Sequence, residues 1–286
     1  GLGDVYKRQL ETRELGYFVA VAEELHFGHA AARLSIAQPA LSKAIRRIES
    51  RLGVTLLLRS SRNVSLTPAG EALLHHGRHA LNAVAAAAES ARKAADPRSH
   101  LRLVIKPGGD ANMLSRILAR YARLPDARQV DILFGGNTDR AGYLRDGRAD
   151  VALLYAPFDD LTGLVHETIH VEGRVAVLPP DHRLAGCTEV RLADLEGETM
   201  PRWKDVHDGG TGPEIGDVPQ LVQMVILGRT IAMLPRSFVD PAPAGLVCLP
   251  VTDAPASRLV VARSELDRRP LVAAFVEAAV ASREDM

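Results

Sequence analysis

The 286-residue sequence has only two cysteines, Cys187 and Cys248, which lie far apart and outside any Cys-x-x-Cys pattern. Their spacing argues against a disulfide framework and against a cysteine-based zinc site. The sequence also lacks an apolar run close to the roughly 18 residues that a membrane span needs, and it lacks the charged start and apolar stretch of a signal peptide. We therefore expect a soluble protein of the reducing cytoplasm that contacts no membrane.

The chain also lacks an overall charge, because 35 basic residues balance 35 acidic ones. The total therefore neither indicates nor excludes a nucleic-acid partner, and only the local distribution is informative. Between positions 10 and 66, eight basic residues stand against five acidic ones, so positive charge concentrates in the first part of the chain. Hydrophobic residues at 47% and charged residues at 24% are typical of globular domains, and the length favours a small domain followed by a larger one.

Apolar residues at helical spacing predict three helices in the first domain. The first has one buried face, and a short second helix follows over about residues 29–34. The third runs from about residue 39 to residue 52, since Pro39 suits a first helical position and Gly53 a C-terminal stop. The residues expected to be buried are Leu15, Phe18, Val19, Ala22 and Leu25 of the first helix, Ala31 and Leu34 of the second, and Leu41, Ile45, Ile48 and Leu52 of the third.

The outward face of the third helix carries an amide, a hydroxyl and cations. Gln38 and Ser42 lie four residues apart, and Lys43, Arg46 and Arg47 add positive charge. Such a face has the donors that bind base edges and phosphates in a major groove. An ordinary solvated face is the alternative, because basic helices are common.

A strand–turn–strand pattern follows the third helix. Two short apolar stretches, 56–58 and 64–66, flank a polar turn, with Arg59 and Arg62 near its tip. An arginine at such a tip can reach the minor groove or the backbone phosphates. The pattern predicts a wing that adds affinity with little dependence on base sequence.

Four motifs in this order resemble those of LysR-type bacterial transcription regulators. They are YFVAVAEE at 17–24, AQPALS at 37–42, LG at 52–53 and LTPAG at 66–70. The resemblance implies a winged helix-turn-helix whose DNA contacts are Gln38, Ser42, Lys43 and Arg46 on the recognition helix, Arg59 and Arg62 in the wing, and Arg13 near a backbone contact. One departure is visible, because the family commonly has Phe-Glu-Arg where this chain has Leu57-Leu58-Arg59.

A long helix with a seam of mostly small residues is predicted over about residues 67–96. The seam alternates by three and four positions through Leu74, Gly77, Leu81, Val84, Ala88, Ala91 and Ala95. The resemblance implies an antiparallel dimer through this linker helix, with contacts from Leu74, Leu81, Val84, Ala88 and Ala91. Packing on the same chain is the alternative. A solvated face explains His75, His76 and His79 better than a metal site does, because no carboxylate or cysteine ligand accompanies them.

The rest of the chain alternates between strand-like and helix-like patterns. Apolar runs predict strands at 101–105, 130–134, 151–155 and 175–178, with helical patterns at 112–123 and 140–146. This order is typical of an α/β domain with parallel βαβ units, whose ligands bind beyond the carboxyl ends of the strands. The resemblance implies two lobes like those of a periplasmic binding protein. The second lobe should be reduced, because only a short Gly-rich stretch follows Trp203 where many family members have an extra helix.

Two glycine-containing loops follow predicted strands and precede predicted helices. Free N–H groups at helix starts favour an anionic group, so we expect a small organic anion as the effector. The candidate effector contacts are Lys106, Gly108 and Gly109 in the first loop, Asn137 and Thr138 in the second, and Arg202 and Trp203 from the second lobe. Glycines that only form turns are an equal alternative.

Two other functions remain as alternatives. His166-Glu167-x-x-His170 matches the zincin pattern of metalloenzymes, which requires a helix. The surrounding residues favour a strand instead, in which residues four apart lie roughly 13 Å apart. A molybdate-responsive regulator would have a similar winged helix with a C-terminal module of a different fold.

The sequence thus predicts a multidomain α/β protein. Its expected parts are a non-native, adapter-like leader at 1–9, a winged helix-turn-helix at 10–66, a linker helix at 67–96 and an effector domain at 97–286. Within the effector domain, lobe 1 should cover about 97–170 and 255–286, and lobe 2 about 171–254. We expect a transcription regulator that is not an enzyme, needs no cofactor or metal, and binds double-stranded DNA, a small-molecule effector, RNA polymerase and further copies of itself as a dimer or tetramer.

Overall fold

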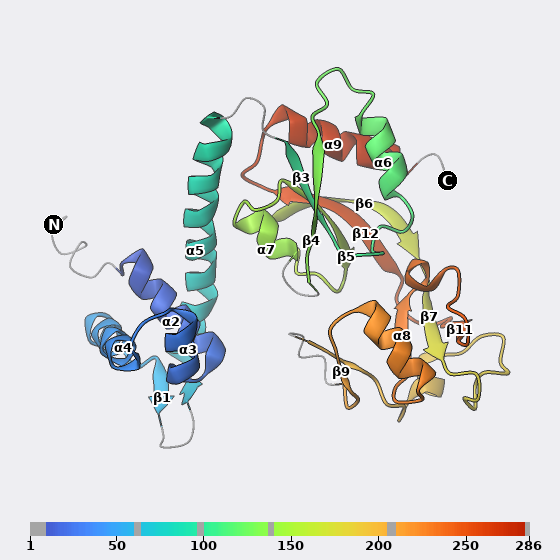
Figure 1. Cartoon of the computed structure of the whole chain (residues 1–286), viewed down its shortest axis with the longest axis horizontal. Helices are drawn as coiled ribbons and strands as arrows, with labels where there is room; N and C mark the ends of the chain where they lie inside the picture. Colours follow the sequence, from blue (N-terminus) through green and yellow to red (C-terminus); the bar gives the residue numbers. More distant parts are fainter. Residues whose placement is uncertain (1–9, 60–63, 96–99, 137–139, 205–209, 284–286) are drawn as a thin grey trace. The chain divides into compact units, whose positions relative to one another are not determined.

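The computed structural model describes residues 10–59, 64–95, 100–136, 140–204 and 210–283. The chain forms two units, residues 1–88 and 89–286, which we describe separately (Figure 1). Across the described ranges, no helix has the length and apolar character needed to cross a membrane.

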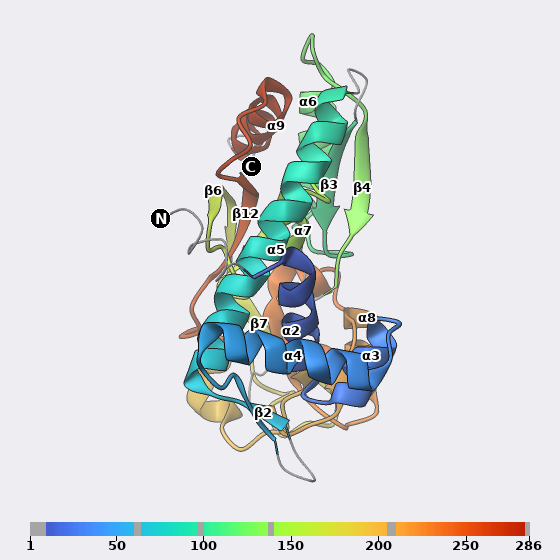
Figure 2. The same ribbon diagram turned by 90° about the vertical axis from the view of Figure 1, so that its left-hand side faces the viewer.

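The first unit is a three-helix group followed by a two-stranded hairpin and a long helix. Its elements are α2 (Thr12–Glu24), α3 (Phe27–Arg33), α4 (Gln38–Leu52), β1 (Leu57–Arg59), β2 (Val64–Leu66) and α5 (Pro68–Ala95), of which the last turns, from Glu89 on, belong to the second unit. Helix α4 runs across α2 and α3 (Figure 2), and fully buried Phe18, Ile45 and Ile48 lie in the shared core. The antiparallel pairing of β1 with β2 confirms the two strands of the predicted wing, and the predicted turn between them lies outside the described residues.

Two leucines predicted to be buried are exposed instead. Leu25 is 44% exposed and Leu52 is 36% exposed. Leu25 is the C-cap of α2 with a φ of 45°, and Leu52 precedes Gly53, which caps α4 with a φ of 71°. The chain leaves the helical path at Leu25 and directly after Leu52, so both side chains lie at helix ends beyond the part that packs on the core. Leu34, also predicted to be buried, is the C-cap of α3 and is only partly buried.

Helix α5 begins where the sequence predicts, because the Thr67 hydroxyl accepts a hydrogen bond from the Gly70 N–H at 3.0 Å. Leu74 and Leu81 pack against the core of their own unit. A Cβ at Gly77 would lie 2.9 Å from a methyl of Leu15, so glycine permits close approach of α5 to α2. The first half of the predicted seam therefore contacts its own chain, whereas Val84 is 52% exposed.

The first lobe of the second unit is a five-stranded sheet in the order β4-β3-β5-β12-β6. Its elements are β3 (Leu101–Ile105), α6 (Leu114–Tyr121), β4 (Val130–Phe134), α7 (Arg140–Arg145), β5 (Val151–Ala156), β6 (Leu164–Glu172), β12 (Ser257–Ser264) and α9 (Pro270–Ala281). Strands β3, β4 and β5 are parallel as predicted, and β12 is antiparallel to its neighbours. Helices α6 and α9 cover one face, where Tyr121 meets Phe275, and α7 covers the other.

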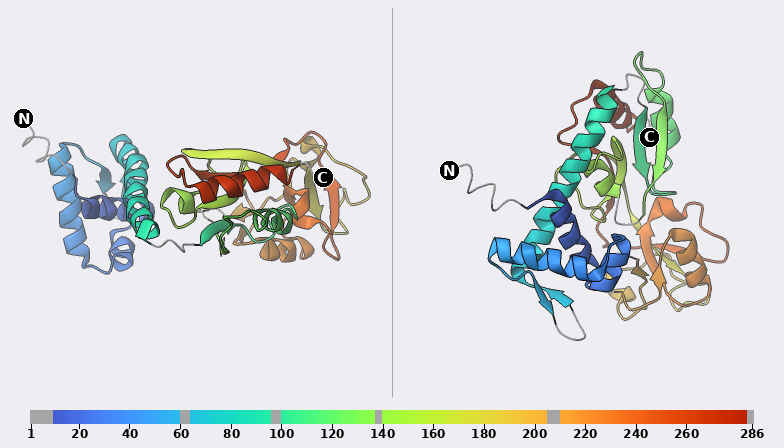
Figure 3. Two further views of the ribbon diagram at one scale, coloured as in Figure 1. Left: turned by 90° about the horizontal axis from the view of Figure 1, so that it is seen from above. Right: turned by 60° about the vertical axis from the view of Figure 1, so that its left-hand side comes forward.

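The second lobe is small. Its elements are β7 (Arg174–Leu178), η1 (Leu192–Leu195), β8 (Arg202–Trp203), β9 (Glu214–Ile215), α8 (Val218–Ile226), β10 (Ala232–Pro235), η2 (Arg236–Val239) and β11 (Val247–Pro250). The main sheet has the antiparallel order β10-β7-β11. The chain crosses between the lobes at Gly173 and again between β11 and β12, and both lobes are visible in Figure 3.

The His166-Glu167-x-x-His170 sequence lies on β6, as the sequence predicts. His166 pairs with Ala262 and His170 with Leu259 in the ladder between β6 and β12. The motif is therefore extended and does not have the helical geometry that a zincin requires. Among the described residues, no group of three or more histidine, cysteine or acidic side chains is arranged to hold a metal ion.

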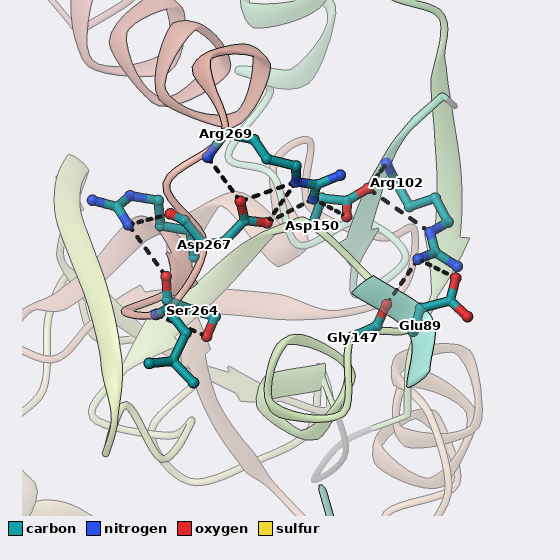
Figure 4. A network of polar contacts seen from close by, with 9 residues as sticks. Glu89, Arg102, Gly147, Asp150, Ser264, Asp267 and Arg269 are labelled. Carbon is teal, nitrogen blue, oxygen red and sulfur yellow. Dashed lines mark hydrogen bonds and ion pairs between the residues drawn. The ribbon is translucent and has the colours of Figure 1, made fainter. Parts of the chain in front are cut away.

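A polar network centred on Asp150 joins several segments at the amino-terminal edge of the first-lobe sheet (Figure 4). The Asp150 carboxylate accepts the Arg102 N–H at 2.7 Å and pairs with Arg269, the N-cap of α9, at 2.5 Å. Arg269 also pairs with Asp267, and Arg102 pairs with Glu89 at 2.9 Å. Because the Asp150 side chain has no exposed surface, both of its oxygens need these donors.

Candidate functional site

The outward face of α4 carries the side chains that the sequence assigns to DNA. Gln38, Lys43 and Arg46 are exposed, and Ser42 is partly buried. Lys43 and Arg46 form no ion pair with another described residue. Arg13 is exposed near the start of α2. These positions leave an amide and three cations available to a polyanion.

Helix α4 is fixed by a buried carboxylate on α2. The Glu14 side chain is 1% exposed and lies 2.6 Å from the Arg47 guanidinium and 2.8 Å from that of Arg51. Burial opposes ionisation, but the Glu11 N–H and the two arginines outweigh it, so the pKa of Glu14 is lowered. Arg47, predicted on the outward face, thus also anchors the helix.

Arg59, predicted as a wing contact to DNA, is turned toward α4. Its guanidinium pairs with Glu49 at 3.0 Å, lies 3.4 Å from the Ser42 hydroxyl and stacks on the Phe27 ring at 4.8 Å. Arg62 lies outside the described residues. The first wing arginine therefore already has an acidic partner within the protein.

A lysine from the first lobe meets aromatic residues of the second lobe. Lys106 follows β3, and its Nζ lies 4.7 Å from the centroid of the Trp203 ring and 5.4 Å from that of Phe238. Burial and the nearby Arg140 cation lower the pKa of Lys106 to about 8, although Asp159 and Asp217 act in the opposite direction. The ammonium is thus held against ring faces rather than in an ion pair.

Charges beside Lys106 are paired with each other. The buried Arg140 guanidinium donates to both oxygens of Asp159, at 2.8 and 2.9 Å, and Asp159 also accepts the Tyr155 N–H. Arg140 donates further to the Gly136 carbonyl at the end of β4. The negative charge of Asp159 is therefore balanced by Arg140. Among the described residues, no carboxylate pairs with Lys106 in the same way.

A second polar group connects the two lobes beside this lysine. The Tyr155 hydroxyl donates to Glu172 at 2.8 Å and lies 3.1 Å from the Ser237 hydroxyl, and Ser237 donates its N–H and its hydroxyl to Glu172. Burial raises the pKa of Tyr155, and Glu172 raises it further against the opposing hydrogen bond with Ser237. The tyrosine therefore stays a neutral donor at physiological pH.

Two family models match the chain. One, described as "Bacterial regulatory helix-turn-helix protein, lysR family", covers residues 12–71, and the other, described as "LysR substrate binding domain", covers residues 94–283. The chain belongs to the LysR family. It is therefore a transcription regulator with a DNA-binding helix-turn-helix and an effector-binding domain. The match of the second domain to the LysR substrate binding domain argues against the molybdate-responsive alternative.

This LysR-type chain aligns over nearly its whole length with several similar proteins. It is 32% identical over 288 residues to the HTH-type transcriptional regulator AlsR of Bacillus subtilis (strain 168), covering 93% of this chain and 94% of AlsR. It is 30% identical over 290 residues to the Hca operon transcriptional activator HcaR of Escherichia coli (strain K12), covering 93% and 96%. The solved structure of full-length CbnR complexed with its target DNA shares the fold, with a TM-score of 0.52, 22% identity and coverage of 96% of this chain and 100% of CbnR.

The structure of this LysR-type regulator brings together only part of the predicted effector set. Lys106 and Trp203 meet, whereas Arg202 is exposed and donates to the Gly212 carbonyl. The Gly109 N–H donates to the Lys106 carbonyl at 2.8 Å, which corrects the expectation that it is free for a ligand. Gly108 is exposed, and Asn137 and Thr138 lie outside the described residues.

The first loop also differs from the predicted helix start. Helix α6 begins only at Leu114, and the Asp110 carboxylate accepts the Leu114 N–H at 3.2 Å. An acidic side chain therefore occupies the position expected for an anion. The sequence reasoning missed Tyr155, Glu172 and Ser237, although Tyr155 is the penultimate residue of a fully buried strand, near the end where ligands of α/β domains commonly bind.

Proposed function

We propose that this LysR-type regulator reads a two-fold symmetric DNA site through α4. Gln38 and Ser42 would contact base edges, and Lys43 and Arg46 would contact phosphates, together with Arg13 and Arg62. The single observation that carries this assignment is the exposure of Gln38, Lys43 and Arg46 on one face of α4. A dimer places two such helices in successive major grooves, which implies an interrupted palindrome.

We further propose that the effector is a small organic anion that binds at Lys106 with Trp203 beside it. Lys106 is largely buried without a bidentate acidic partner, so an anionic group would offset its desolvation. Tyr155, kept neutral by burial and by Glu172, donates its proton to Glu172, so its oxygen can accept a hydrogen bond from a ligand hydroxyl. Such a ligand would bias the lobes only if it binds their arrangements with different affinity.

The remaining parts of the proposal follow the family. We place the winged helix-turn-helix at 10–66, the linker helix at 67–96 and the effector domain at 97–286. The regulator would act in the cytoplasm as a dimer or a dimer of dimers, through RNA polymerase, without catalysing a reaction. Val84, Ala88 and Ala91 of α5 are exposed and available for the dimer contact, whereas Leu74 and Leu81 already pack on their own unit.

Selection of bound duplexes from a random pool, followed by footprinting, tests the DNA assignment. We expect one enriched palindrome with two protected half-sites. Gln38→Ala should reduce the preference for the selected site by roughly 1–3 kcal/mol, whereas Lys43→Ala should weaken all duplexes alike. Equal affinity of the wild type for the selected and random duplexes would refute the proposal.

A thermal-shift screen of small organic acids tests the effector assignment. A stabilising acid should lose its effect on Lys106→Ala and retain it on Lys204→Ala, an exposed lysine in the same lobe as Trp203. Stabilisation that survives Lys106→Ala would place the ligand elsewhere. A clear preference for cationic or neutral apolar ligands would refute the chemistry.

A further inference from the structure

Glu49 connects the recognition helix to the wing in three ways. One carboxylate oxygen accepts the backbone N–H groups of Leu56 and Leu57, at 2.9 and 3.2 Å, where the chain enters β1. The other oxygen pairs with Arg59 at the end of β1, at 3.0 Å. A single side chain on α4 therefore holds both the backbone and the last side chain of the first wing strand.

Arg59 in turn reaches back to the face of α4 that carries Ser42. Its guanidinium lies 3.4 Å from the Ser42 hydroxyl and stacks on the Phe27 ring of α3. The planar fork of arginine suits this combined pairing and stacking, which a lysine cannot reproduce. The arrangement fixes the wing and the hydroxyl relative to one another.

The negative charge of Glu49 distinguishes a role in positioning the wing from a role in the affinity for DNA. A carboxylate near a DNA-binding face repels phosphates, so Glu49 lowers the general affinity for a polyanion. It also neutralises Arg59, whose side chain is only 27% exposed. Glu49 therefore weakens the electrostatic attraction to DNA, and its bonds to Leu56, Leu57 and Arg59 fix the geometry of the wing strand.

We propose that Glu49 and Arg59 are positioning residues that set the wing and Ser42 for base recognition, and that Arg59 does not bind a phosphate. The inference rests on the proposed role of α4 as the recognition helix. It reassigns Arg59 from sequence-independent affinity to specificity. The ion pair should then influence which duplex is bound more than how tightly any duplex is bound.

The test measures the salt dependence of binding and the ratio of affinities for the selected and random duplexes, with the full chain. The double variant Glu49→Gln/Arg59→Gln removes the pair without changing the net charge. We expect an unchanged salt slope and a specificity ratio at least about tenfold lower. Glu49→Gln alone frees Arg59 for a phosphate, so its slope should steepen by about 0.9 while the ratio falls.

Lys43→Ala is the matched control, because an exposed phosphate contact should reduce the slope by about 0.9 and leave the ratio unchanged. A double variant that behaves like Lys43→Ala would show that Arg59 binds a phosphate and would overturn the inference. An unchanged ratio in both Glu49 variants would overturn it as well.

Two further measurements keep the result interpretable. Arg59→Lys retains the charge opposite Glu49 but not the fork, and it should lower the ratio without changing the slope, so it serves if the double variant does not fold. A ratio that Arg59→Lys leaves unchanged counts against the inference. Failure of the wild type to prefer the selected duplex would instead refute the proposed function.

Discussion

The Nζ of Lys106 lies 4.7 Å from the centroid of the Trp203 ring, although the two residues belong to different lobes. Lys106 and Tyr155 are two first-lobe side chains that contact aromatic rings of the second lobe. Trp203 is also the only tryptophan of the chain. Its fluorescence therefore reports on this contact and on the folding of the second unit.

The lowered pKa of Lys106 predicts pH-dependent anion binding. The pKa is about 8, so the free site loses its positive charge as the pH rises through this value. An organic acid that requires the ammonium should bind about tenfold more weakly at pH 9 than at pH 7. Titration of the acid identified by the screen, followed by Trp203 fluorescence, measures this change.

Lys106→Arg is the control for this prediction, because a guanidinium stays protonated throughout the range. Binding by this variant should be independent of pH between 7 and 9. A dissociation constant that does not change with pH in the wild type would contradict the role of Lys106.

The same pKa predicts that the second unit gains stability as the pH rises from about 8 to about 10.4, since the unfolded chain holds the proton more tightly there.

The exposed side chain of Val84 predicts where α5 meets a second copy. Val84→Glu would place like charges in or near the dimer seam, so we expect a shift toward monomers. Ala83→Glu, at a neighbouring exposed position outside the seam, should leave the oligomer intact. Light scattering distinguishes the two results, and an unchanged oligomer in Val84→Glu would move the interface elsewhere.

The network around Asp150 predicts a large stability loss from one substitution. Asp150→Asn would remove the negative charge and replace one of the two buried carboxylate oxygens by an amide N–H, so that either Arg269 or the Arg102 N–H would face another donor, which should destabilise the second unit by about 3 kcal/mol (Figure 4). Asp146→Asn breaks a pair with Arg148, whose side chain is 47% exposed, and should cost under about 1 kcal/mol. Urea unfolding followed by Trp203 fluorescence compares them, and equal midpoints would show that the network is not stabilising.

Local sequence patterns predicted the strands of this protein more accurately than the contacts between its side chains. The strands Leu101–Ile105 and Val130–Phe134 match the predicted ranges, because each is a short apolar run with distinct flanking residues. Lys106 and Trp203 were both predicted as effector residues, and they do meet. The bond between Tyr155 and Glu172 was not predicted, because it depends on how a long strand crosses between lobes, which has no periodic signature.

The sequence also did not predict which partners the polar and charged groups have. Arg59 stands at the place expected for a wing contact, but its pairing with Glu49 depends on the close approach of β1 to α4. Likewise, the Gly109 N–H looked available at a loop, and a turn hydrogen bond to Lys106 uses it. Such details depend on local competition between donors and acceptors that a residue pattern does not contain.

The final prediction concerns Glu14, whose buried carboxylate joins α2 to Arg47 and Arg51 of α4. The pKa of Glu14 is lowered in the folded chain, so its ionised form stabilises the first unit at pH values above the ordinary glutamate pKa. This contribution should disappear as the pH falls through the lowered value. Glu14→Gln should therefore destabilise the first unit at pH 7 by about 3 kcal/mol, because two guanidinium groups lose the negative charge and one of them faces an amide N–H instead of an oxygen.

Far-ultraviolet circular dichroism during thermal unfolding follows the helices of both units, and Trp203 fluorescence follows the second unit alone, so a transition seen only by circular dichroism belongs to the first. We expect Glu14→Gln to lower the helical transition at pH 7 and to leave the Trp203 transition unchanged. The difference from the wild type should narrow toward acidic pH, because protonation of Glu14 produces the same loss in the wild type. A difference that stays constant from pH 7 down to the acid transition would show that the substitution acts through packing, and the ion triad would then not be what holds α4 in place.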